Sequence, residues 1–240
     1  MNNVILVSPA CTADSAKQLA ELLDIPHCYI DDFEGATSEQ RVINWGCSKI
    51  PHTKAEAIIF NKPGAVRRTL NKITAFSLLS PHVRMPVMTE DKDDAYGWAE
   101  EGRKVVVRNR VKGCKSQGIT ITNKPDDILN LEAKFYTRFI ENCKEYRINV
   151  YKNKVLTVYY KLPCNGDFAF KIRLNEEDAW QAKVQDMITA VHEHIHLDEF
   201  GLDVLVSPKG KHFLLEVNSA PILFPITTRR LAKAIKKDFE

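Results

Sequence analysis

Short apolar runs alternate with an amphipathic stretch along the first sixty residues. Residues 4–7, 28–30, 42–45 and 57–60 are apolar runs of strand length, and apolar side chains between residues 16 and 23 recur at helical spacing. Strands that alternate with helices usually form a parallel sheet covered by those helices. The pattern therefore predicts a small parallel α/β unit over residues 1–62.

The pattern changes after Pro63 and Gly64, which interrupt regular structure. Apolar residues at helical spacing predict one helix over residues 66–79, and Trp98 lies in a shorter helical patch, where we expect it to pack in a core. Residues 105–108 and 119–122 predict two strands of a hairpin with a polar tip. We expect residues 63–134 to form a second unit.

The remaining residues, 135–240, are expected to form a third unit. Apolar runs predict strands over residues 135–140, 146–151, 155–162, 168–173, 202–206 and 213–217. Between them, residues 180–195 carry the most regular amphipathic helix pattern of the chain. A last helix begins near Thr228, with Leu231, Ile235 and Phe239 on one face and cations on the other. Its default interpretation is a solvated surface helix, and a role in binding nucleic acid or membrane is the alternative.

Composition narrows the class of protein but does not name its chemistry. The 240 residues are 44% apolar and 27% charged, which is typical of a soluble globular protein and excludes disordered chains and disulfide scaffolds. No apolar run is long enough for a transmembrane helix, and no cationic segment precedes the first strand, so neither a membrane span nor a signal peptide is expected. The net charge of +3 does not favour nucleic-acid binding. Six cysteines without a CxxC pair predict reduced thiols in the cytoplasm.

Three oxygen-bearing side chains occur on the last predicted strand pair. Asp203 is on one strand, and Glu216 and Asn218 are two residues apart on the next, so that these two share a face. An antiparallel pairing would bring Asp203 near them. Carboxylate and amide oxygens beside apolar walls suit Mg²⁺, while solvated carboxylates on a surface hairpin are the alternative.

Two basic patterns could contact phosphates. Cations at residues 108, 110, 112 and 115 surround a loop bounded by Gly113 and Gly118, which could aim backbone N–H groups at phosphate, although basic hairpin tips are common. Polar side chains also recur on predicted strands, where they indicate either a cleft that binds phosphate or a face exposed to solvent. They are Glu145, Arg147, Lys161, Lys171 and Arg173. Neither a P-loop nor a dinucleotide-binding glycine motif is present.

The sequence HEHIH at residues 192–196 is a weaker candidate for a metal site. His192 and His196 are four residues apart and could share a metal on a helix. His194 would point elsewhere, and Glu193 is not placed as in a zinc protease. We therefore favour the polar end of a helix, where cationic side chains suit the exposed carbonyl groups.

Several of these segments, taken in order, resemble the ATP-grasp enzymes. They are the helix start at residues 71–72, the strand and glycine loop over residues 105–118, residues 139–141 and 145–147, and the closing sequences GLD at 201–203 and EVNSAP at 216–221. The resemblance extends over about residues 58–225. Lys161 followed by NGDF at residues 165–168 is similar to the ligases that add glutamate to a ribosomal protein and to small bacteriophage-encoded relatives. The resemblance implies an α/β chain in which two α+β lobes of the ATP-grasp fold follow a short N-terminal unit.

The resemblance also implies a role for individual residues. Lys72 and Arg108 would face the phosphates of ATP, and the loop with Gly113, Ser116 and Gly118 would close as a lid. Backbone groups of Arg138, Phe139 and Ile140 would hold adenine, and Glu141 the ribose. Mg²⁺ would be held by Asp203, Glu216 and Asn218. The transferred phosphoryl group would meet Arg147, Lys161 and Arg173.

The activity that follows from this resemblance is ATP-dependent ligation of a carboxylate to an amine through an acyl phosphate, with ADP as a product. The substrates would be amino acids, peptides or protein termini. A kinase or a ligase of nucleic-acid ends on the same fold is one alternative, and a nucleotide-binding regulator without turnover is another. The resemblance allows a homodimer, implies no membrane partner, and places a phage-encoded chain in the host cytoplasm.

Overall fold

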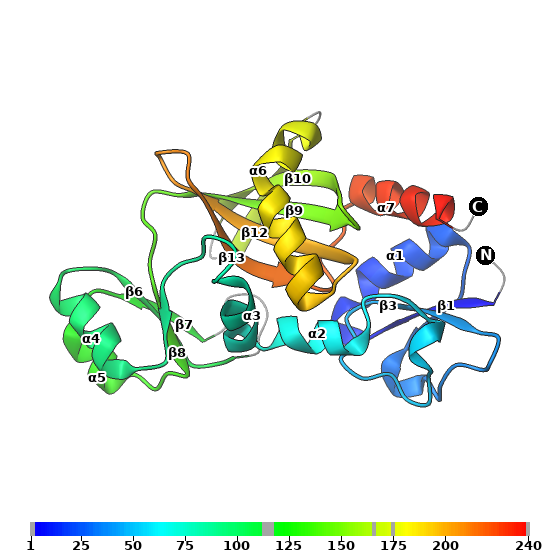
Figure 1. The fold of residues 1–240 in the computed structure, drawn as a ribbon, viewed down its shortest axis with the longest axis horizontal. Helices are drawn as coiled ribbons and strands as arrows, with labels where there is room; N and C mark the ends of the chain where they lie inside the picture. The colour runs from blue at the N-terminus through cyan, green and yellow to red at the C-terminus, as the bar shows by residue number, and fades with distance from the viewer. Residues whose placement is uncertain (1–2, 112–117, 165–166, 174–175, 239–240) are drawn as a thin grey trace.

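The computed structural model describes residues 3–111, 118–164, 167–173 and 176–238, and within them the strands form three sheets (Figure 1). The first is a four-stranded parallel sheet with the order β2-β1-β3-β4. Its elements are β1 (Val4–Ser8), α1 (Ala13–Leu23), β2 (His27–Tyr29), β3 (Arg41–Asn44) and β4 (Ile58–Phe60), with single 3-10 turns at Ala10–Thr12, Ile30–Asp32 and Ala55–Ala57. The predicted N-terminal parallel α/β unit is confirmed.

The prediction of one helix over residues 66–79 is wrong. The segment forms two helices, α2 (Pro63–Leu70) and α3 (Lys72–Leu79). Asn71 between them is extended, with φ −93° and ψ 106°, and its side chain accepts a hydrogen bond from the N–H group of Thr74 at 3.2 Å. This N-cap starts a new helix, and it places Lys72 in the first turn.

The second sheet is antiparallel and has the order β5-β8-β6-β7. Its strands are β5 (Met88–Thr89), β6 (Val105–Arg108), β7 (Ile119–Thr122) and β8 (Phe135–Arg138), and the associated helices are α4 (Lys92–Glu100) and α5 (Pro125–Asn130). The predicted hairpin is β6 and β7. Trp98 packs with Val105, Val107 and Ile128 in the core of this unit. Strand β8 follows the expected boundary at residue 134 but pairs with β5 and β6, so it extends this sheet rather than the next one.

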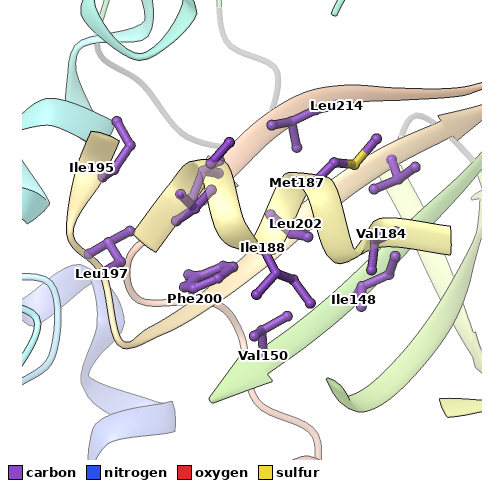
Figure 2. Packing of buried hydrophobic residues seen from close by; sticks show 14 of the residues in the cluster. Ile148, Val150, Val184, Met187, Ile188, Ile195, Leu197, Phe200, Leu202 and Leu214 are labelled. Carbon is purple, nitrogen blue, oxygen red and sulfur yellow. The ribbon is translucent and has the colours of Figure 1, made fainter. Parts of the chain in front are cut away.

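The third sheet has five strands in the order β11-β10-β9-β12-β13, all antiparallel. They are β9 (Lys144–Tyr151), β10 (Lys154–Cys164), β11 (Asp167–Ile172), β12 (Glu199–Val206) and β13 (His212–Asn218). Helix α6 (Glu177–Ala190) and a π-helical turn, Val191–Ile195, lie over one face, where Ile188 packs on Val150 and Phe200 (Figure 2). Because side chains alternate along a strand, the opposite face carries the polar residues.

The last helix, α7 (Pro225–Lys237), packs alongside α1 of the N-terminal unit (Figure 1). Leu231 and Ile235 are fully buried in the same cluster as Leu19 and Trp45, so the apolar face of the predicted surface helix is part of a core. Phe239, also expected on that face, lies outside the described residues. No helix in the described residues has the length and apolar character that a membrane span needs.

Candidate nucleotide and metal site

The polar face of the five-stranded sheet carries a buried ion pair at its centre. The strand register sets Asp203 of β12 beside Arg147 of β9. The guanidinium group of Arg147 donates through Nε to Asp203 Oδ1 and through Nη2 to Oδ2, the latter at 3.0 Å. Gly201 makes room for this side chain, because an added Cβ would lie 3.1 Å from Arg147 Cδ and 3.0 Å from Pro221 Cβ. The two-point contact holds both charged groups in one orientation.

Lys161 of β10 joins the same network. Its Nζ contacts the carboxylate of Glu145 and lies 3.4 Å from Asp203 Oδ2, and its side chain is 8% exposed. Glu145 and Arg147 share a face of β9, as their spacing predicts. The sequence identified Glu145 only as a polar strand residue and gave it no role. Its spacing of two residues from Arg147 was the feature that placed it on the same face. Each buried cation of this network therefore has a carboxylate partner, which burial requires.

The pKa values of the two carboxyl groups move in opposite directions. Burial opposes the charged form of Asp203, but Arg147 and Lys161 outweigh it and lower its pKa. Burial raises the pKa of Glu145, and Lys161 only partly offsets this effect. Asp203 is therefore a carboxylate at neutral pH and keeps the two cations in place.

A second cluster lies where helix α3, strand β6 and strand β13 meet. Lys72 Nζ is 2.5 Å from Glu216 Oε1, and the two side chains line a narrow crevice together with Arg108. Burial lowers the pKa of Arg108, and Glu216 partly offsets this. The buried Nε of Arg108 has no hydrogen-bond partner among the described residues. An anionic oxygen is the kind of group that would satisfy a buried, unpartnered N–H on a side chain that lines this crevice.

The predicted metal ligands Asp203, Glu216 and Asn218 come together on this face. Asp203 lies opposite Glu216 in the ladder, and Asn218 lies opposite Gly201. The buried Nδ2 of Asn218 has no partner in the described part of the chain, so this amide is not committed to a structural hydrogen bond. Two carboxylates and an amide are a donor set that fits Mg²⁺. Among the residues that the structure describes, no group of three His, Cys, Asp or Glu side chains is placed to hold a metal ion, so the candidate Mg²⁺ site depends on the Asn218 amide as its third protein ligand.

The predicted adenine segment follows the end of β8. The N–H groups of Arg138 and Phe139 donate to the carbonyl oxygens of Val87 and Lys104, both at 2.9 Å. The guanidinium group of Arg138 stacks over Trp98 at 4.8 Å. The carboxylate of Glu141 is exposed, 3.1 Å from Lys104 Nζ. The N–H groups of Arg138 and Phe139 are therefore already used, and adenine could bind only the carbonyl groups of this segment and the N–H group of Ile140.

Only part of the predicted glycine loop can be placed. Gly113 and Ser116 lie outside the described residues. Gly118 has a φ of 72°, and its carbonyl accepts a hydrogen bond from the N–H group of Asn109 at 3.1 Å. A Cβ at this position would lie 1.9 Å from Asn109 Oδ1, so the closing position of the loop requires glycine.

The structure does not bring Arg173 to this face. In the β10–β11 ladder Phe170 is opposite Lys161, and Lys171 is opposite Tyr160. Lys171 therefore lies on the face opposite to Lys161. Arg173 is two residues further along, so it lies on the same face as Lys171. Its Nη2 is 2.6 Å from Glu176 Oε1. Burial raises the pKa of Tyr146, which packs at a tilt against Trp180 of α6, and the charge of Arg173 partly offsets this rise. Sequence spacing alone shows which residues of one strand share a face, but it does not show which residues of a neighbouring strand lie on that face.

Comparison with known proteins yields matches in structure but not in sequence. No model of a known protein family and no curated protein matches the chain. The ATP-grasp ligase PsnB, solved with a minimal precursor variant, Mg and ADP, superposes with a TM-score of 0.72 at 11% identity, covering 100% of this chain and 99% of that one. D-cycloserine synthetase DcsG gives 0.67 at 16% identity, with 99% of both chains covered.

D-alanyl-alanine synthetase A from Vibrio cholerae gives a TM-score of 0.65 at 14% identity, covering 96% of this chain and 92% of that one. These matches extend along the whole chain, and they agree with two antiparallel α+β lobes that follow a parallel N-terminal sheet. The chain therefore has the ATP-grasp fold.

Proposed function

We propose that this chain is an ATP- and Mg²⁺-dependent ligase that joins a carboxylate to an amine and releases ADP and phosphate. The observation that carries the proposal is the polar sheet face, where Asp203 and Glu216 lie beside Arg147 and Lys161 on an ATP-grasp fold. Similar structures are named ligases or synthetases, and PsnB was solved with Mg and ADP. The substrates in this proposal are amino acids, peptides or protein termini.

Nucleotide binding would use both clusters. Lys72 and Arg108 would contact the phosphates. Their crevice of about 10 Å³ has room for about one water molecule, so Lys72 would first have to move away from Glu216 to admit a phosphate group. The segment from Arg138 to Ile140 would hold adenine, Glu141 the ribose, and the loop with Gly113, Ser116 and Gly118 would cover the phosphates. Asp203, Glu216 and Asn218 would hold Mg²⁺. When bound, Mg²⁺ supplies charge neutralisation on the phosphate oxygens.

The chemistry would proceed in two displacements. A carboxylate oxygen of the substrate attacks the γ-phosphorus, and the bond from that phosphorus to the ADP oxygen breaks. The amine nitrogen then attacks the acyl carbon, phosphate leaves with the electrons of the C–O bond, and the amine loses a proton to a base. Arg147 and Lys161 would stabilise the charge on the transferred group, since Asp203 and Glu145 hold their charged ends on this face. Arg173 stays a prediction without a contact to this cluster.

A product assay tests the proposal directly. Purified protein is incubated with Mg-ATP, a pool of amino acids and peptides, and hydroxylamine, and ADP, AMP and hydroxamate are measured together. ADP with hydroxamate is expected, because hydroxylamine traps an acyl phosphate. AMP with pyrophosphate would point to an adenylating ligase of nucleic-acid ends, and bound ATP without any turnover in a complete substrate pool would point to a regulator.

The metal assignment has its own variant. Glu216→Ala is expected to lower product formation about 10²–10³-fold, as loss of one electrostatic group typically does. Glu132→Ala, which removes an exposed carboxylate between α5 and β8, is the matched control and should behave as the wild type. Normal turnover by Glu216→Ala would show that the metal ligands are misassigned.

A further inference from the structure

A basic groove lies between α1 and α7, the two helices that pack side by side near the ends of the described chain (Figure 1). The α1–α7 groove has a volume of about 450 Å³, and its lining consists of Leu22 from α1 and, from α7, Arg229, Ala232, Lys233, Lys236 and Lys237. The four cations lie four, three and one residues apart. They therefore share one side of α7.

These cations have no carboxylate within ion-pair distance among the described residues. Burial opposes the charged form of the neighbouring Asp238, but hydrogen bonds from Lys152 and Tyr151 outweigh it and lower its pKa, and Lys237 contributes least. The adjacent Arg230 differs, because it pairs with Glu177 and donates to the Leu156 carbonyl at 2.6 Å. The acidic residues of α1, Asp14 and Glu21, act on Lys17, which stacks over Tyr29 on another side of that helix. All the charged side chains that line the groove within the described residues are therefore positive.

Helix stability explains only part of this patch. Lys236 and Lys237 lie in the last turn of α7, where cations stabilise the helix dipole. Arg229 and Lys233 are one to two turns earlier, beyond the reach of that effect. Leu22 is 40% exposed in the groove, whereas Leu19 and Leu23 of the same helix are buried. The groove thus combines cations that have no ion-pair partner among the described residues with a partly exposed apolar side chain.

We propose that the α1–α7 groove docks an acidic peptide segment in which an apolar side chain lies among glutamates or aspartates. The carboxylates would pair with the four cations, and the apolar side chain would cover Leu22. From Arg229 to Lys237 the helix rises about 12 Å, the length of about four extended residues. Nucleic acid fits less well, because none of the described residues that line the groove is aromatic and could stack on a base.

This docking site is independent of the proposed ligase function, and its test measures no turnover. The probe is a fluorescein-labelled eight-residue peptide of alternating glutamate and leucine, titrated by fluorescence anisotropy at 50 mM and 300 mM salt. Saturable binding that weakens with salt is expected, because the cations are exposed. A peptide of alternating lysine and leucine should not bind.

Matched variants locate the site. The double variant Lys233→Gln/Lys236→Gln should weaken peptide binding roughly tenfold at low salt, and Leu22→Asn about threefold. Lys209→Gln/Lys211→Gln removes the same charge from the exposed β12–β13 turn and should bind the peptide as the wild type does. Circular dichroism shows that each variant is folded. Equal binding by the groove variants and the wild type overturns the proposal, as does tighter binding of a ten-residue oligouridylate or of phosphatidylserine vesicles that the groove variants lose.

Discussion

Two groups of cations in this molecule contrast in how their charges are balanced. On the polar face of the five-stranded sheet, Arg147 pairs with Asp203 and Lys161 with Glu145. In the α1–α7 groove, four exposed cations face solvent. The difference follows from burial, because a charge taken out of water needs a partner and an exposed charge does not. The buried set is held in fixed positions, which suits catalysis, and the exposed set is available to a partner.

The largest effect is expected from breaking the central buried pair. Asp203→Asn leaves Arg147 and Lys161 without their shared carboxylate, and should cost about 3–5 kcal/mol of unfolding free energy. Product formation should fall about 10³-fold or more, since a proposed metal ligand is also lost. Denaturant unfolding and the product assay measure the two effects. Asp186→Asn on the exposed side of α6 is the control, and an Asp203→Asn protein as stable as that control would contradict the pairing.

A smaller effect separates the two faces of the sheet. Lys161→Gln should reduce turnover about 10²-fold, because it removes a cation from the polar face. Arg173→Gln should change turnover less than about threefold, because its partner is a half-exposed glutamate on the opposite face. Steady-state rates with saturating ATP compare the variants. Equal losses would restore the catalytic role that the family resemblance implies for Arg173.

The smallest effect, taken per pH unit, concerns a buried carboxyl group that has no cation beside it among the described residues. Glu199 is fully buried, its Oε2 has no partner among the described residues, and burial raises its pKa well above 4.5. The folded state then holds this proton more tightly than the unfolded state, so stability falls as pH rises above about 4.5 toward the folded pKa. Glu199→Gln removes that dependence. Its stability relative to the wild type should rise by up to about 1.4 kcal/mol per pH unit in this window.

Urea unfolding of both proteins from pH 4 to pH 8 measures this difference. The buried amide of the variant adds a cost that is the same at every pH, so the slope is the informative quantity. Two parallel stability curves would show that Glu199 titrates in the folded protein as it does in the unfolded chain.

Local pattern was enough for most elements of the fold. Strand runs and helical spacing located the N-terminal parallel unit, the β6–β7 hairpin and the last two strands, because these depend on residues close together in sequence. The family resemblance supplied the name of the fold, which the structural matches confirm. The helix break at Asn71 was not predicted, because apolar residues at helical spacing occur on both sides of it. The new helix starts there because the Asn71 side chain caps it.

By itself, the sequence determined that Glu216 and Asn218 share a face and that Glu145 alternates with Arg147, because the period of a strand is a local property. Only the tertiary structure decided that Arg147 meets Asp203, that Arg173 lies on the other face, and that Leu22 of α1 borders the cations of α7. These neighbours come from strand register and helix packing between distant segments. Such contacts depend on how the whole chain fills its cores, and no single segment encodes them.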